Sequence, residues 1–198
     1  AQQNSESKTV NSKGGVQTKD FELKIDEYDA NRHFFLAHYF RNRYNDAVSK
    51  LPQIKATLNI TRLEVWVTNI KDGSYPANNA NDLYNQMTTT YSGARQISDV
   101  ESVLTGFTGG SEYEAIENAR LLDPNSEYIY DKQLGYLSLN MSLQEGQMLA
   151  VAFEYEYSDA SGKRTGRVGE FSDSNPTNPS NCLYVKLLRG TNMSPPMK

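Results

Sequence analysis

The stretch that most constrains the fold of this chain covers residues 21–69, where a helical pattern is followed directly by a strand pattern. Residues 21–25 alternate apolar and charged side chains, which is typical of a short half-buried strand. Between Asp29 and Pro52, apolar side chains recur every three or four residues and form one stripe of an amphipathic helix. Asp29 suits a helix N-cap, and Pro52 cannot continue a helix. We therefore predict a strand followed by a long N-terminal helix.

The strand pattern after this helix covers residues 60–68. Leu63, Val65 and Val67 alternate with more polar residues and define one apolar face. Trp66 lies on the opposite face, among polar side chains. We expect that this opposite face is also covered, at least in part, by another layer.

The second half of the chain changes to a period of two, which predicts strands. These strands cover residues 128–130, 136–139, 148–157, 167–171 and 183–188. Two shorter helices are predicted before them, at 98–104 and 112–122, each beginning with a capping-box pattern. The predicted fold class is α+β: a mostly antiparallel sheet with a C-terminal meander, and a long N-terminal helix and shorter helices packed on one face.

The domain organisation follows from where the pattern is lost. Residues 20–190 are predicted to form a single domain, which fits a chain of 198 residues. Residues 1–19 are polar and aperiodic, and we expect a disordered linker tail; residues 191–198 are a second linker. Residues 74–97 are predicted to be a long polar loop or insertion. The first residue is Ala1, and we expect a processed protein or an excised piece of a longer one.

Charge and cysteine content exclude several classes of function. The net charge is −4 and the pI is about 5.3, without a basic stripe, so nucleic acid is not expected as a partner. Cys182 is the single cysteine, which rules out an internal disulfide, and we expect a buried thiol. There is no run of 18 apolar residues, so this segment is not expected to span a membrane by itself.

The sequence contains few residues arranged for catalysis. His33 and His38 are five apart, whereas a zinc pair on one helix needs a spacing of four. Glu154 and Glu156 share a strand face, and Glu170 is expected across the hairpin, as in carboxylate pairs that cleave sugars. A solvated sheet face carries the same pattern, and we predict no catalytic residue, metal or cofactor.

Partner contacts are expected instead in the two long polar segments, residues 74–97 and residues 172–181. Long loops of this kind carry contacts when a rigid sheet supports them. The residues that we predict to contact a partner are Trp66, Tyr75, Tyr84, Tyr91, Asn175 and Asn178.

Several strings in the chain resemble a known family in the expected order. The first are FELKI (21–25), YDANRHFFLAHYFRNRY (28–44), Leu51–Pro52 and ITRLEVWVTN (60–69). The later ones are YEAIENARLLDPN (113–125), QLGYLSLN (133–140), LAVAFEY (149–155), VGEFS (168–172) and LYVKLLRG (183–190). Across residues 21–190 the chain resembles the SprA/Sov family, the very large outer-membrane proteins of Bacteroidota that form the translocon of the type IX secretion system and support gliding motility.

The resemblance implies a soluble, non-catalytic domain of such a translocon, with a structural, gating or partner-contacting role. Its partners would be the rest of the barrel polypeptide, secreted cargo proteins and accessory secretion subunits. It would be outer-membrane associated and extracytoplasmic, on the cell surface or in the periplasm. The alternative is a surface carbohydrate- or adhesin-type binding module, which requires an exposed row of Trp66 and tyrosine side chains.

Overall fold

The computed structural model describes residues 31–68, 77–80, 91–110, 112–116, 119–174 and 182–191, and for residues 77–80 only the backbone. The strand predicted at residues 21–25 lies outside these ranges, as do residues 1–19, residues 192–198 and the remainder of the segment 74–97.

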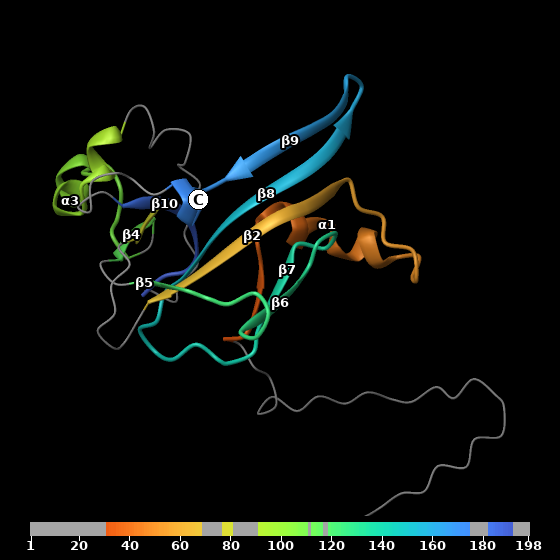
Figure 1. Ribbon diagram of the computed structural model, residues 1–198, viewed down its shortest axis with the longest axis horizontal. Coiled ribbons are helices and arrows are strands. Elements are labelled where there is room, and N and C mark those ends of the chain that lie inside the picture. The colour runs from red at the N-terminus through yellow and green to blue at the C-terminus, as the bar shows by residue number, and fades with distance from the viewer. Residues whose placement is uncertain are drawn as a thin grey trace, which may run out of the picture.

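The larger of two sheets has seven strands in the order β4-β3-β10-β8-β2-β5, with β9 also paired to β8. The β3–β10 pair is parallel and the other pairs are antiparallel. The longest pair joins β2 to β8 and forms the centre of the molecule (Figure 1). The seven strands are β2 (Leu58–Thr68), β3 (Ala77–Ala80), β4 (Tyr113–Ile116), β5 (Ala119–Leu121), β8 (Leu149–Asp159), β9 (Gly162–Val168) and β10 (Leu183–Arg189).

A smaller antiparallel sheet covers one face of the central pair. It contains β1 (His33–Phe35), β7 (Tyr136–Leu139) and β6 (Tyr128–Asp131), and the helix α1 (His38–Val48) follows β1 directly. Alternate residues of β2 and β8 point into this layer, where they meet Leu36 and Phe40 in the largest apolar core. The core residues from the two central strands are Ile60, Leu63, Val65, Val67, Leu149, Val151 and Phe153.

The opposite face of the central pair is also covered. Trp66, Ala150 and Ala152 pack there with Phe171 and Val185 in a second buried cluster. A third cluster packs Tyr184 of β10 with residues of two short helices, η2 (Ser92–Arg95) and α3 (Val100–Val103), between which lies η3 (Ile97–Asp99). The expectation that the Trp66 face is covered is confirmed, because Trp66 is buried there.

The predicted α+β class with a long N-terminal helix is wrong, because the protein is mostly β and mainly antiparallel. The helix α1 has 11 residues and starts only at His38. The first part of the apolar stripe instead forms β1, where Phe34 pairs with Leu137. Aromatic residues favour strands, and a short apolar run does not by itself distinguish a helix from a strand.

The helix predicted at residues 112–122 is also wrong, because this segment forms β4 and β5. Tyr113, Ile116 and Ala119 are buried at a spacing of three, which is typical of a helix. Here the same spacing arises because the residues belong to two short edge strands, β4 and β5. Of the helix predicted at 98–104, only Val100–Val103 is α-helical. Neither α1 nor α3, the two α-helices within the described ranges, is long and apolar enough to cross a membrane.

The strands predicted from residue 128 onward are confirmed in number, but they do not form one meander. The strands β6 and β7 belong to the smaller sheet, while β10 lies between β3 and β8. The strand predicted at 167–171 lies earlier, at Gly162–Val168, because it forms a hairpin with β8 from Asp159↔Gly162 to Phe153↔Val168.

Candidate partner-binding site

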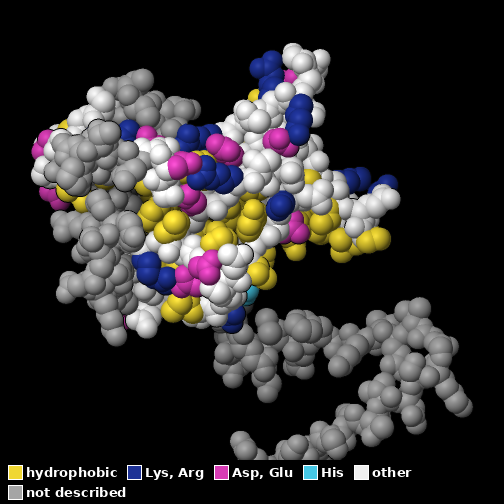
Figure 2. Space-filling view, viewed as in Figure 1, with side chains coloured by type: hydrophobic (Ala, Val, Ile, Leu, Met, Phe, Trp, Pro, Cys, Tyr) yellow, Lys and Arg dark blue, Asp and Glu magenta, His cyan; other side chains and the backbone are white. Residues whose placement is uncertain are grey.

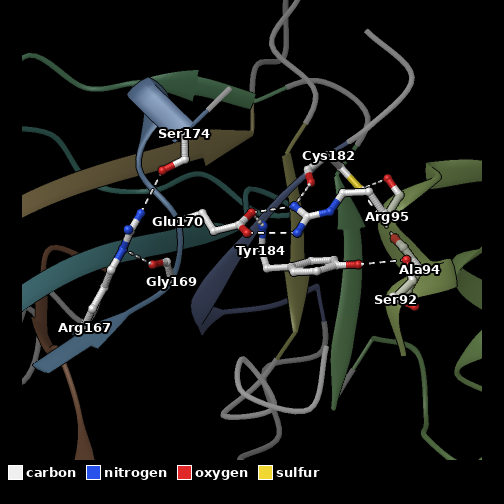
Figure 3. A network of polar contacts seen from close by, with 9 residues as sticks. All are labelled: Ser92, Ala94, Arg95, Arg167, Gly169, Glu170, Ser174, Cys182 and Tyr184. Carbon is white, nitrogen blue, oxygen red and sulfur yellow. Dashed lines mark hydrogen bonds and ion pairs between the residues drawn. The ribbon is translucent and has the colours of Figure 1, made fainter. Parts of the chain in front are cut away.

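Arg95, inside the predicted contact segment 74–97, binds residues on both sides of the segment 172–181 (Figure 3). Arg95 ends η2, inside the segment 74–97, whereas Glu170 and Cys182 flank the segment 172–181. Arg95 Nη1 donates to Glu170 Oε2 at 2.6 Å, and Nη2 donates to Glu170 Oε1 at 2.9 Å. Arg95 Nη1 also donates to the carbonyl oxygen of Cys182 at 2.9 Å. The Arg95 side chain therefore connects the segment 74–97 to the residues on both sides of the segment 172–181.

The sheet brings these residues together because β9 and β10 lie end to end along one edge of β8. The pair Phe153↔Val168 belongs to β9, and Lys186↔Val151 belongs to β10. Gly169 directly follows β9, and it turns the chain with a φ of +78°, which glycine adopts at little cost. A Cβ at this position would lie 3.1 Å from Ala152 Cβ, so the close approach to β8 also requires glycine.

After Gly169, the chain runs beside β10. The Glu170 amide donates to the Tyr184 carbonyl at 2.7 Å, and the Tyr184 amide donates to Glu170 Oε2 at 3.0 Å. Glu170 thus accepts hydrogen bonds from both a guanidinium and a backbone amide. These contacts use the carboxylate as an internal brace between β10 and η2.

Burial strengthens this ion pair. The side chains of Arg95 and Glu170 are 27% and 12% exposed, and Arg95 Cζ lies 3.9 Å from the centre of the Tyr184 ring. A bidentate arginine–carboxylate pair of this kind has a fixed geometry, and the arginine also gains from the ring face. The hydrogen bond to Glu170 raises the pKa of Arg95, while burial raises the pKa of Tyr184 to about 12. Arg95 stays charged and Tyr184 stays neutral at neutral pH.

Cys182 completes the junction as a structural thiol. It is fully buried, and its Sγ donates to the Arg95 carbonyl oxygen at 2.8 Å. The Cys182 amide donates to the same oxygen at 3.0 Å. Burial keeps this thiol away from solvent, as we predicted for the single cysteine.

A second cluster holds the first residues of the segment 172–181 against β2. The Phe171 ring is buried and contacts two guanidinium groups, with Arg62 Cζ at 3.9 Å and Arg167 Cζ at 4.8 Å from its centre. Arg167 also donates to the Gly169 carbonyl oxygen at 3.0 Å and to Ser174 Oγ at 2.8 Å. Both cations are within the range of a favourable cation–π contact with this ring.

Carboxylates complete this second cluster. Arg62 contacts Glu64 at 3.0 Å and Asp173 at 2.9 Å, and its hydrogen bond lowers the pKa of Asp173. Glu64 accepts hydrogen bonds from the Ser172 amide at 2.8 Å and from the Ser172 hydroxyl at 2.9 Å. The residues before 175–181 are therefore held by both β2 and η2.

The predicted contact residues fall into two groups. Trp66 is 3% exposed, in the core, while Tyr91 is half-buried with its ring 5.5 Å from that of Phe107. The other predicted residues, which are Tyr75, Tyr84, Asn175 and Asn178, lie outside the described residues.

The residues considered for catalysis or metal binding are separated. His33 lies in β1 and bonds Ser138 Oγ at 3.0 Å, whereas His38 begins α1. Glu156 forms an ion pair with Lys163 at 2.7 Å on the β8–β9 hairpin, and Glu170 binds Arg95 elsewhere. Within the described ranges, no group of three or more His, Cys, Asp or Glu side chains is placed to hold a metal ion.

Sequence reasoning missed the residues that build the junction. Arg95 lies in a weakly patterned polar segment, and its partner Glu170 is 75 positions away. The sequence indicated Glu170 only as a carboxylate across the hairpin from Glu154 and Glu156, and not as the partner of Arg95. Comparisons with models of known protein families and with curated proteins found no match for this chain.

Proposed function

We propose that this chain is a non-catalytic, partner-contacting domain of an outer-membrane protein secretion translocon of the SprA/Sov type, acting in type IX secretion and gliding motility. The ordered strings between residues 21 and 190 support the family assignment. The observation that carries the partner-contacting role is the junction of Arg95 with Glu170 and Cys182.

This junction matters because it holds together the residues that follow 81–90 and the residues that flank 175–181. Residues 81–90 are followed by η2, which carries Arg95, and residues 175–181 lie between the Phe171 cluster and Cys182. Segments whose flanking residues are held by a rigid sheet are frequent sites of partner binding. The charged side chains of this site bind one another and the backbone, so they act in holding the chain in place. This role favours recognition over catalysis.

The partners that this function implies are the remainder of the barrel polypeptide, secreted cargo and accessory secretion subunits. The domain would act outside the cytoplasm, in association with the outer membrane. The alternative of a carbohydrate- or adhesin-type module is less well supported, because the buried Trp66 cannot belong to an exposed aromatic row.

The test replaces the two segments without touching their anchors. In the parent gene, residues 81–90 or residues 175–180 are exchanged for glycine–serine sequences of the same length, which leaves β3, Arg95, Glu170 and Cys182 in place. We expect reduced cargo secretion at an unchanged level of the parent protein in the outer membrane. Protection of Cys182 from thiol reagents in the purified chain controls for folding. Normal secretion with both replacements would contradict the proposed function.

A further inference from the structure

The strands β8 and β9 extend beyond the rest of the sheet as a two-stranded arm (Figure 1). The strand β2 accompanies β8 only as far as Tyr157, which pairs with Leu58. The β8–β9 pairing continues to Asp159↔Gly162 at the tip. The arm is therefore a feature of the surface and not of the core.

The outer edge of β9 is open along the described part of the chain, because β9 pairs there with β8 alone. In an antiparallel pair, alternate residues direct their N–H and C=O groups away from the partner strand. The strand has seven residues and contains no proline, so each residue keeps its N–H donor. Such an edge is a template for one further strand.

The arm is preformed by a row of aromatic rings. Ring centres of Phe153 and Tyr155 are 6.1 Å apart, and those of Tyr155 and Tyr157 are 6.0 Å apart. The Tyr155 ring covers Gly166, its cross-strand neighbour in β9. A preformed edge lowers the entropy lost when a partner strand binds.

The charge on β9 has one sign. The strand carries Lys163, Arg164 and Arg167 and no acidic residue. Lys163 and Arg164 are 67% and 53% exposed, and each forms one ion pair within the arm, with Glu156 and with Asp159 respectively. Exposed pairs are weak, and both cations retain further donors. Figure 2 shows these cationic and acidic side chains interspersed on the projecting arm.

The same charges disfavour a second copy of this chain as the occupant. An antiparallel β9–β9 pair centred on Thr165 would place Lys163 opposite Arg167. Like charges directly opposite each other destabilise a strand pair. An acidic segment would gain from the same positions.

We infer that the outer edge of β9 binds an extended, acidic segment of another polypeptide as an added strand. Backbone hydrogen bonds to β9 would supply the pairing, and carboxylates beside Lys163 and Arg164 would supply the selectivity. This inference rests on the proposed partner-contacting role, and it specifies one partner as an extended acidic polypeptide segment.

The test uses a phage-displayed library of random linear peptides selected on the immobilised 198-residue chain. We expect enrichment of proline-free peptides that carry acidic residues on both faces of the added strand, because Lys163 and Arg164 are consecutive and lie on opposite faces of β9. One enriched peptide is then made in two N-methylated forms, each methylated on one of the two alternating sets of residues. Because an added strand uses only one set of N–H groups, one form should bind at least tenfold more weakly while the other binds like the parent peptide.

Protein variants provide the matched control. The double variant K163E/R164E should shift the enriched peptides from acidic to basic, whereas R41E, on the exposed side of α1, should select the same acidic peptides as the parent. No enrichment, or equal effects of the two N-methylated forms, would overturn the inference. The secretion result is independent, since a failure of peptide pairing leaves the test of residues 81–90 and 175–180 unaffected.

Discussion

Arg95 and Glu170 are 75 positions apart in the sequence and form a bidentate ion pair with N–O distances of 2.6 and 2.9 Å. This pair joins η2 to the segment between β9 and β10, and Arg95 adds a hydrogen bond to the Cys182 carbonyl. It therefore holds the C-terminal part of segment 74–97 against the residues that flank segment 172–181.

The variant Glu170→Gln should lower the free energy of unfolding by about 2 kcal/mol, because it leaves the largely buried Arg95 without its counter-charge. Urea unfolding followed by Trp66 fluorescence measures this loss. Labelling of Cys182, the single thiol, should become faster as the junction opens. The control Glu154→Gln, on the half-exposed face of β8, should change stability by less than about 0.5 kcal/mol. Equal effects of the two variants would contradict a bracing role for Glu170.

Stability should fall as the pH rises from 10 to 12, because burial raises the pKa of Tyr128 and of Tyr184 from 10.0 to about 12. Below pH 10 both tyrosines are neutral in the folded and unfolded chain, and their contribution is fully present. Between these values the unfolded chain loses protons that the folded chain keeps, at a cost of up to roughly 2–3 kcal/mol for each tyrosine. Urea unfolding at a series of pH values should show a flatter decline in the Tyr128→Phe/Tyr184→Phe variant. An identical decline would show that these tyrosines are not the cause.

The variant Gly169→Ala should lower stability by about 2 kcal/mol, from backbone strain at positive φ and from crowding against Ala152 and the Val151 carbonyl. Gly146→Ala is the matched control, since Gly146 has a φ of +76° with no neighbouring atom within 4 Å of a Cβ. It should lose about 1 kcal/mol, from strain alone. Thermal or urea unfolding of the two variants measures the difference. A cost for Gly169→Ala no larger than that of the control would remove the crowding argument.

Trp66 should emit at short wavelength and resist quenching by acrylamide, because it is 3% exposed beneath Phe171 and Val185. It is the only tryptophan, so the signal is free of other contributions. Unfolding in urea provides the reference for an exposed indole. Strong quenching in the folded chain, or a spectral change on adding soluble oligosaccharides, would favour the carbohydrate-binding alternative.

The alternating patterns located part of the strands, because a strand with one buried face shows a period of two in its sequence. The strands β2, β8 and β10 were predicted in this way, although the first five residues of β8 and of β10 are all buried, on both faces of the sheet. The pattern failed where a short apolar run fits two periods, as at Phe34 in β1 and at Ile116 in β4. In both places, pairing with a distant strand decided the conformation.

The sequence by itself determined a β-rich second half, a buried face beneath Trp66 and a lone thiol suited to the interior. It also carried the resemblance on which the proposed function depends. Only the tertiary structure decided that Arg95 meets Glu170 and that β9 keeps an open edge, because both depend on contacts between residues far apart in the chain. Local periodicity reports which side of an element is buried, whereas strand order and the pairing of single charges are settled when the sheet assembles.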